Sequence, residues 1–241
     1  MNNTNLLILI LFQNRNILMH NITLIIPAKN ESESLPSVLN ELKQYPYKID
    51  IILHSTDSET IQSIKNYDVN VIYQKNFGYG DALIHGINQC KTEYFCIFNA
   101  DGSFNPLEID EMYKSLNDKE LDFIFASRYD ANSGSDDDTL LTLIGNYIFT
   151  YIGKIFFRLN ISDILYTFII GKTEQAKKLH LDQKNFSFCV ELPIKAKKMK
   201  IKLGCINSHE RKRIAGKKKV NAFKDGFLIL KYMIKLFFMK S

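Results

Sequence analysis

The sequence of 241 residues predicts an α/β fold, a Rossmann-like three-layer domain with a mostly parallel central sheet. Two observations support this prediction. Short apolar runs rich in β-branched residues, of the kind buried in parallel sheets, recur through the first half of the chain. Segments with capping residues and helical periodicity lie between these runs. Strands and helices that alternate at this spacing form right-handed βαβ units, whose ligands bind beyond the carboxyl ends of the strands.

The first half of the chain is expected to contribute five strands and the helices that connect them. The predicted strands are 22–27, 49–54, 69–73, 93–99 and 121–127. The predicted helices run from a cap at Ser32 or Ser34 to about Tyr45, from the capping cluster at 55–58 to about Asn66, and over 81–90 and 106–116. Each of the first four strands is followed by a helix, as a parallel sheet requires.

Beyond Arg128 the alternation gives way to longer segments. We expect an acidic loop over 130–138, a long apolar helix over 140–159 interrupted by Gly145 and Gly153, a helix over 188–200, a strand over 201–206, a basic loop over 209–219 and a helix over 222–240. No clean domain boundary is visible in this half of the chain. The prediction is therefore one domain over 21–220, with an N-terminal appendage over 1–20 and an amphipathic basic helix over 221–241.

Charge is divided unevenly along the chain. Residues 1–193 hold 16 Lys and Arg against 24 Asp and Glu, a net charge of −8, whereas residues 194–241 hold 15 against 2, a net charge of +13. The basic end favours contact with phosphate groups or an acidic membrane surface. A solvated lysine-rich face would give the same composition. We expect no nucleic-acid partner.

The cysteines and the N-terminus indicate a cytosolic protein. None of the four cysteines forms a CxxC pair or lies at zinc spacing from a histidine, so reduced core thiols are expected. The apolar stretch Leu6–Phe12 is too short to span a bilayer, and it lacks the basic start and the cleavage site of a signal peptide.

Polar residues follow four of the predicted strands, at the edge of the sheet where ligands bind. These segments are 27–31, 54–57, 99–101 and 127–128. Asp101 follows a buried strand and precedes a glycine, a position from which a carboxylate can hold a hard divalent cation. Such a cation neutralises a departing diphosphate. A lone aspartate at a strand end also serves as a turn or capping residue.

Several short motifs, taken in their order and spacing, resemble glycosyltransferase family 2. They are PAKNE at 27–31, NFGYGDALIHGI at 76–87, NADGSFNP at 99–106, SRY at 127–129, Ser162-Asp163 with 166–168, Val190-Glu191, and Arg213 to Gly216 leading to Lys219. The pattern is most similar to the branch that transfers mannose or glucose to polyprenyl phosphates. The resemblance runs from about residue 22 to 232, and it implies the GT-A fold and a catalytic domain over 21–220.

For the nucleotide-sugar donor, the resemblance implies a nucleobase and ribose pocket lined by Pro27, Asn30 and Glu31, with Asn99 also on the donor side. Gly78 and Gly80 would let the backbone approach the nucleotide closely. The residues leave other roles open: Asn30 and Glu31 are also suited to cap a helix, and Gly80 to form a turn.

For the metal and the phosphates, the resemblance implies that Asp101 is catalytic and ligates Mg²⁺ or Mn²⁺. Arg128, also catalytic, would bind phosphate, as would Arg211, Arg213 and Lys219 of the basic loop. Arg128 is equally suited to a surface ion pair with the carboxylates at 130 or 136–138. The lysines of the basic loop are also compatible with a solvated run of charge.

The sequence departs from the family pattern at several positions. Asn99 replaces the first carboxylate of the metal motif, and Ser103 replaces a glutamine common in close relatives. Leu53-His54-Ser55 stands in place of an acidic nucleoside-binding motif, and acidic or neutral residues around Asp138 replace a basic one. Lys218 replaces a serine. A site with fewer carboxylates should hold its cation more weakly and depend more on the donor's own phosphate oxygens.

The expected reaction is an inverting, metal-dependent transfer of a hexose from a GDP-mannose or UDP-glucose type of donor to a polyprenyl phosphate. A phosphate acceptor needs cations rather than a general base, and the basic loop supplies them; a hydroxyl acceptor would need a base such as Asp163 or Glu191. Transfer to a saccharide or lipid hydroxyl, and binding of a nucleotide or lipid without turnover, are the alternatives.

The terminal helix adds an expectation about membranes. Lys224, Lys231 and Lys235 share one side of it, and apolar residues cover the rest, so it resembles an interfacial helix more than a spanning one. The segment 140–157 is a second candidate for this surface, beside the terminal helix; the alternative is that both helices cover the sheet as core. We therefore expect a protein that is peripheral on the cytoplasmic face of a membrane.

Overall fold

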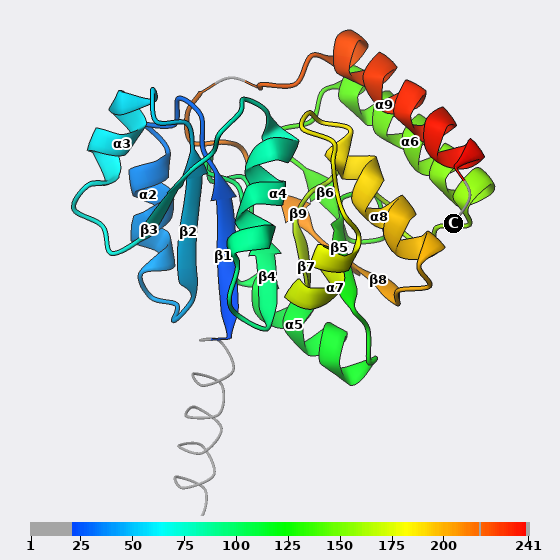
Figure 1. The fold of residues 1–241 in the computed structure, drawn as a ribbon, viewed down its shortest axis with the longest axis horizontal. Helices are drawn as coiled ribbons and strands as arrows, with labels where there is room; N and C mark the ends of the chain where they lie inside the picture. Colours follow the sequence, from blue (N-terminus) through cyan, green and yellow to red (C-terminus); the bar gives the residue numbers. More distant parts are fainter. Residues whose placement is uncertain (1–20, 217, 240–241) are drawn as a thin grey trace, which may run out of the picture.

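The computed structural model describes residues 21–216 and 218–239. The appendage predicted over 1–20 lies outside these residues. Within them, a seven-stranded sheet forms the centre of the fold, with the strand order β3-β2-β1-β4-β7-β5-β8 (Figure 1). Its strands are β1 (Ile22–Pro27), β2 (Lys48–Leu53), β3 (Asn70–Tyr73), β4 (Tyr94–Ile97), β5 (Phe123–Ser127), β7 (Ile169–Lys172) and β8 (Leu203–Asn207). All neighbouring pairs are parallel except those of β7, which confirms the predicted fold class.

Strand β7 was not predicted from the sequence. It runs antiparallel between β4 and β5, in the interior of the sheet. Its apolar part, Ile169 and Ile170, is too short to be recognised in the sequence as a strand. Gly171 is required in this position because a Cβ atom there would lie 1.9 Å from Cδ1 of Phe123.

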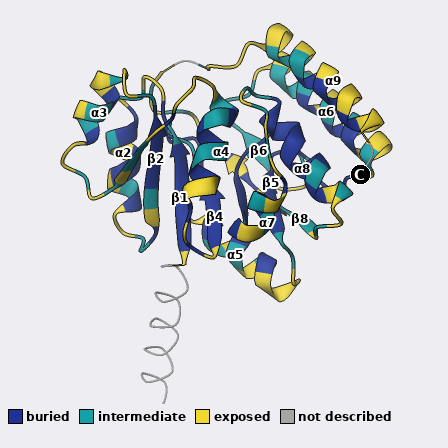
Figure 2. Cartoon of the chain, viewed as in Figure 1, coloured by how far each residue is buried: buried dark blue, intermediate teal, exposed yellow. Residues whose placement is uncertain are grey.

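Helices cover both faces of the sheet and make the fold three-layered (Figure 1). They are α2 (Leu35–Leu42), α3 (Ser58–Ile64), α4 (Tyr79–Gln89), α5 (Glu108–Asp118), α6 (Leu140–Phe157), α7 (Thr173–Lys178), α8 (Phe188–Lys198) and α9 (Ala222–Phe238). Two hydrophobic cores result, one shared by the sheet with α2, α3 and α5, the other with α4, α7, α8 and α9. The central strands β1, β4, β5 and β7 are almost entirely buried, whereas the edge strands β3 and β8 are partly exposed (Figure 2).

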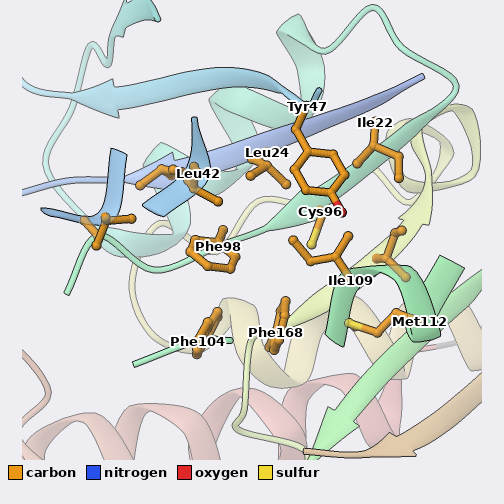
Figure 3. Packing of buried hydrophobic residues seen from close by; sticks show 14 of the residues in the cluster. Ile22, Leu24, Leu42, Tyr47, Cys96, Phe98, Phe104, Ile109, Met112 and Phe168 are labelled. Carbon is orange, nitrogen blue, oxygen red and sulfur yellow. The ribbon is translucent and has the colours of Figure 1, made fainter. Parts of the chain in front are cut away.

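Three phenylalanines of the first core support the central strand end. Phe98 meets Phe104 edge to face at 5.8 Å between ring centroids, and Phe104 stacks on Phe168 at 4.6 Å (Figure 3). All three are fully buried. Pairs of this kind contribute roughly 0.5–1.5 kcal/mol beyond their buried area. The polar segment 99–103 therefore lies on a rigid aromatic base, since Phe98 precedes it and Phe104 follows it.

Two capping predictions have different outcomes. Asp57 is the N-cap of α3, and its carboxylate accepts the amide of Thr60 at 3.3 Å. Ser34 is the N-cap residue of α2, but its hydroxyl donates to Glu31 and caps no amide.

Helices α6 and α9 lie side by side at the outer edge of the molecule (Figure 1). Gly145 and Gly153 do not interrupt α6, which is continuous over its 18 residues. Its buried residues are Asn146, Thr150 and Gly153, and most of its large apolar side chains are half or more exposed. Phe149, Ile152 and Phe157 nevertheless pack against the second core, so α6 joins the core in part, as α9 does through its four buried residues.

The basic loop predicted over 209–219 begins with a short strand. His209–Glu210 forms β9, which pairs in parallel with β6 (Gly134–Ser135) in the acidic segment. This pairing brings the acidic segment and the basic loop together above the carboxyl edge of the main sheet.

Candidate active site

A cleft of about 740 Å³ lies at the carboxyl ends of β1, β2, β4 and β5. Nine of the residues singled out from the sequence line it, namely Pro27, Asn30, Glu31, Gly78, Asn99, Asp101, Arg128, Arg213 and Lys219. Among the described residues, Gly80 and Arg211 are not part of this lining. The cleft is thus built at the edge of the sheet where the strand order predicts a ligand.

Asp101 lies near the centre of the cleft, on the turn after β4. One carboxylate oxygen accepts the amide of Ser103 at 3.0 Å, and the other lies 3.4 Å from a guanidinium nitrogen of Arg213. The turn requires Gly102, whose φ is +81° and where a Cβ atom would lie 2.5 Å from Ile214. Asp101 is therefore held in place from both sides, with 14% of its side chain exposed.

The residues around Asp101 fit a divalent cation that is shared with a ligand. In the described part of the chain, no group of three or more His, Cys, Asp or Glu side chains is placed to hold a metal ion. Asp101 offers a carboxylate, and Asn99, whose amide nitrogen donates to Ser103 at 3.3 Å, keeps an amide oxygen for a ligand. Mg²⁺ is commonly held by one or two carboxylates together with substrate phosphates. Such a cation would need oxygens from a diphosphate to complete its coordination.

Arg213 links the basic loop to the acidic segment. Its guanidinium forms a bidentate pair with Asp137, with N–O distances of 3.1 and 2.7 Å, and faces Asp101 on its other side. The ammonium group of Lys218 lies 3.3 Å from Asp137 and 3.7 Å from Asp138. Burial opposes ionisation of Asp137, but hydrogen bonds and charge from the two cations outweigh it and lower the pKa of Asp137.

Glu31 and Asn30 are tied to neighbouring loops. Glu31 pairs with Lys219 at 2.9 Å, and Asn30, in the left-handed region at φ +52°, donates its amide to Asp57 at 2.7 Å. Neither side chain caps α2. Because Lys219 reaches across to Glu31, the basic loop spans the cleft from one side to the other.

Arg128 is a buried element of the cleft wall rather than a surface ion pair. Its guanidinium binds Asp163 at 2.7 and 3.2 Å and Glu210 at 3.0 Å, and lies 4.4 Å from the ring centre of Tyr166. Burial works against the charge, but these carboxylates raise the pKa of Arg128 well above its ordinary value. Asp138 is a further partner, at 3.5 Å. Arg128 therefore stays charged.

Both glycines of the 76–80 loop are required by packing against the chain itself. A Cβ atom on Gly78, whose φ is +137°, would lie 2.1 Å from the carbonyl oxygen of Lys184. One on Gly80 would lie 2.0 Å from that of Gln183. The close approach that the sequence predicted is therefore made to segment 183–185, and only Gly78 also borders the cleft.

Arg211 points away from the cleft. Its guanidinium forms a bidentate pair with Glu41 at 2.7 and 3.0 Å and donates to the carbonyl of Phe104. This arrangement anchors the start of the basic loop on α2.

Other cleft residues were not singled out as site residues. His54 and Phe77 stack at 4.0 Å between ring centroids at one end, and 65% of Phe77 is exposed. Asp137, Glu210 and Lys218 form the wall opposite Asp101. The acidic run 136–138 was the available signal for this wall, although its partners lie some 75 residues further along the chain.

The far end of the cleft is apolar. Side chains of α6 and α9 line it, including Leu141, Ile144, Ile148, Phe149, Phe223 and Ile229. The cleft therefore joins a charged centre to an apolar channel between the two outer helices.

A mostly parallel sheet with a carboxylate and basic side chains at the carboxyl ends of its strands is typical of α/β enzymes that bind phosphate-bearing ligands. The family model described as "Glycosyl transferase family 2" matches residues 23–179, and the chain belongs to this family. The motifs thus predicted the family correctly.

Curated relatives support the family. An uncharacterized glycosyltransferase of Mycobacterium tuberculosis is 26% identical over 107 residues, which cover 44% of this chain and 48% of the relative. The undecaprenyl-phosphate 4-deoxy-4-formamido-L-arabinose transferase of Pseudomonas fluorescens is 30% identical over 103 residues, 37% of this chain and 30% of the relative. The chain thus matches about half the length of the first of these relatives and less of the second.

A solved structure supports the fold. Glucosyl-3-phosphoglycerate synthase from Mycobacterium tuberculosis, in complex with Mn²⁺, UDP and glucosyl-3-phosphoglycerate, superposes with a TM-score of 0.72. The match covers 94% of this chain and 83% of the synthase, at 10% identity. The fold is therefore the GT-A fold.

Proposed function

We propose that this glycosyltransferase transfers a hexose, with inversion, from a GDP-mannose or UDP-glucose type of donor to a polyprenyl phosphate. The observation that carries the proposal is the continuity of the cleft. It runs from Asp101 past Arg213 and Lys218 into the apolar channel between α6 and α9. A lipid phosphate has the same sequence of properties, with an anionic head joined to an apolar chain.

The donor is proposed to occupy the end of the cleft that carries His54 and Phe77, with its diphosphate toward Asn99 and Asp101. Stacked aromatic side chains provide a face on which a nucleobase can lie. Mg²⁺ or Mn²⁺, when bound with the donor, would neutralise the leaving diphosphate. Asp101 and Asn99 would hold this cation.

The acceptor phosphate requires docking rather than deprotonation. It is an anion at neutral pH, so no general base is needed to make it nucleophilic. Arg213, which lies 3.4 Å from Asp101, and Lys218 are cations that line the same cleft as the apolar side chains of α6 and α9. The two carboxylates suited to act as bases, Asp163 and Glu191, are fully buried and do not line the cleft as described.

Membrane association follows from the outer helices. In the described residues, Leu140–Phe157 is the helix long and apolar enough to cross a bilayer by length and composition. It packs against α9, whose exposed face alternates lysines with Phe227, Ile234 and Phe238. Lysines beside exposed apolar groups suit an interface with anionic lipids. We therefore propose that both helices lie in the cytoplasmic surface of a membrane, where the channel between them meets the lipid.

A hydroxyl acceptor is the second candidate. The acidic side chains of Asp137 and Asp138 at the acceptor end favour it, since they reduce the positive charge available to a phosphate. The glucosyl-3-phosphoglycerate synthase, which shares the fold, was solved with a soluble sugar conjugate.

The test is transfer of radiolabelled sugar by the full chain, with Mn²⁺, from GDP-mannose or UDP-glucose to undecaprenyl phosphate in detergent. We expect label in an extractable lipid. Asp101→Ala should remove this activity, whereas Asp118→Ala, an exposed carboxylate on α5, should not. Transfer to saccharide or lipid hydroxyls with none to the lipid phosphate would contradict the proposal.

Membrane binding is tested by sedimentation with vesicles of phosphatidylglycerol and phosphatidylcholine. Replacing the exposed Phe227, Ile234 and Phe238 by serine should release the protein from the vesicles without disturbing the core. Unchanged sedimentation would contradict the interfacial placement.

A further inference from the structure

The cations proposed to receive the acceptor phosphate already hold an anion, and that anion belongs to the chain. Asp137 accepts two hydrogen bonds from the guanidinium of Arg213, at 3.1 and 2.7 Å, and lies 3.3 Å from the ammonium of Lys218. Its side chain is 11% exposed. This fork of one arginine and one lysine is the arrangement by which proteins bind phosphate groups.

The local charge balance leaves no surplus for a second anion. Arg213 and Lys218 contribute two positive charges. Asp137, Asp138 and Asp101, all within 4.0 Å of one of these cations, contribute three negative charges. A phosphate that entered this site beside Asp137 would meet uncompensated repulsion, because like charges at such distances oppose one another strongly in a partly buried site.

We propose that Asp137 is a specificity-determining residue whose carboxylate occupies the seat of the acceptor phosphate, so that a phosphate binds only by displacing it. The inference rests on the proposed function. Because a phosphate monoester carries about −1.5 to −2 charge and three acceptor oxygens, it can replace a carboxylate on these cations, whereas a hydroxyl or a single carboxylate gains nothing by doing so. Asp137 thus lowers the apparent affinity for a phosphate and leaves that for an uncharged hydroxyl unchanged, so it sets how strongly the site prefers a phosphate.

The surroundings allow Asp137 to move. It belongs to the segment between the short strand β6 and helix α6, and it lies on neither element. Its backbone amide is held by the hydroxyl of Ser135 at 3.1 Å, a contact that does not depend on the carboxylate. Arg213 and Lys218 keep 20% and 30% of their side chains exposed, so both remain accessible from the cleft.

The test compares Asp137→Asn with Asp136→Asn in the full chain. Asp136 is the matched control, since its carboxylate is 59% exposed and pairs with His209 rather than with the fork. Binding of farnesyl phosphate, a short polyprenyl phosphate, is measured by calorimetry, with farnesol as the uncharged probe. We expect Asp137→Asn to bind farnesyl phosphate about tenfold more tightly than the wild type, because the state in which the carboxylate occupies the two cations is removed. Its affinity for farnesol, and the affinities of Asp136→Asn for both probes, should be unchanged.

Equal or weaker binding of farnesyl phosphate by Asp137→Asn would overturn the proposal, because it would show that Asp137 only positions Arg213. An equal gain for farnesol would also overturn it, since the effect would then come from widening of the channel. Asp137→Ser provides a second variant if the first is unfolded, and thermal unfolding checks both.

The proposed function fails in a different experiment. If the wild-type chain transfers no sugar to polyprenyl phosphate while Asp137→Asn still gains affinity for farnesyl phosphate, Asp137 occupies a phosphate-binding position and the acceptor is another phosphate. If transfer occurs and the variant gains no affinity, the role proposed for Asp137 is wrong and the proposed function is retained.

Discussion

Glu191 offers a sharp test of how the fold supports the site. Its side chain is fully buried in α8, and its carboxylate accepts the amides of Asp182 and Gln183 at 2.9 Å, the hydroxyl of Tyr232 at 2.9 Å and the ammonium of Lys195 at 2.6 Å. It therefore joins α8 and α9 to the segment on which the Gly78 loop packs. We predict that Glu191→Gln destabilises the protein strongly.

The magnitude follows from the four donors around Glu191. Glutamine keeps the shape, but it removes the charge and turns one acceptor oxygen into a donor that faces other donors. Breaking a buried charged pair by removing one partner costs about 3–5 kcal/mol. For a chain of this length each kcal/mol corresponds to roughly 2–4 °C in Tm, so we expect a fall of about 6–20 °C.

The assay is thermal unfolding followed by circular dichroism, with Glu174→Gln as the control. Glu174 is 77% exposed, and its partner among the described residues is Lys177 on its own helix. Its variant should unfold within about 1–2 °C of the wild type, as exposed pairs contribute little. If Glu191→Gln behaves like this control but loses activity by a factor of 100 or more, a range typical of general-base loss, Glu191 acts in catalysis and the structural reasoning is refuted.

Three further predictions concern the cleft and its supports. Gly80→Ala should lower both Tm and the affinity for nucleoside diphosphates, because its Cβ atom would overlap the carbonyl oxygen of Gln183. Gly145→Ala is the control and should raise Tm slightly, because a Cβ atom there has nothing within 4 Å. An equal response of the two variants in unfolding and nucleotide titrations would contradict this prediction. Phe77→Ala should weaken nucleoside diphosphate binding about tenfold in calorimetry through loss of base stacking, and unchanged affinity would place the base elsewhere. Since the folded-state pKa of Asp137 is lowered, its stabilising contribution is present above the unfolded pKa of about 3.9 and lost as pH falls through the folded value. Acid unfolding should therefore be less steep below about pH 4 for Asp137→Asn than for the wild type, and identical curves would contradict it.

The parallel part of the fold was predictable from the sequence because its signals are local. β1 was predicted over the residues that form it, and β2 to β5 were predicted to within a few residues. A buried strand is visible in the sequence as an apolar run next to a turn or capping residue. β7 lacks this signal, and its place between β4 and β5 depends on partners that lie 44 to 78 residues earlier in the chain. Only the packing of Gly171 against Phe123 shows why the strand fits there.

The position of the site was predictable from the sequence, but the ion-pair partners of its side chains were not. Asp101, Asn99 and Arg128 were identified because they follow strands directly, and all three line the cleft. Arg128 was expected to bind phosphate or, as the alternative, to pair with the carboxylates at 130 or 136–138. Its principal partner is Asp163, and Asp138 is a further one at 3.5 Å. Ion pairs between loops depend on the tertiary arrangement of the loops, which leaves no periodic pattern in the sequence.

The basic residues near the end of the chain lie in two different structural settings. The basic segment was expected to meet an external anion, but the cations of the loop first meet the acidic part of the same chain: Arg211 pairs with Glu41, Arg213 with Asp137, and Lys219 with Glu31. The pair of Arg211 anchors the loop on α2, and the pairs of Arg213 and Lys219 neutralise cleft carboxylates that would otherwise repel a diphosphate. The exposed lysines of α9 have a different setting, next to exposed apolar side chains, where they are accessible to a membrane. Added salt should therefore weaken vesicle binding while leaving the more buried pairs of the loop largely intact, because screening acts chiefly on exposed charges.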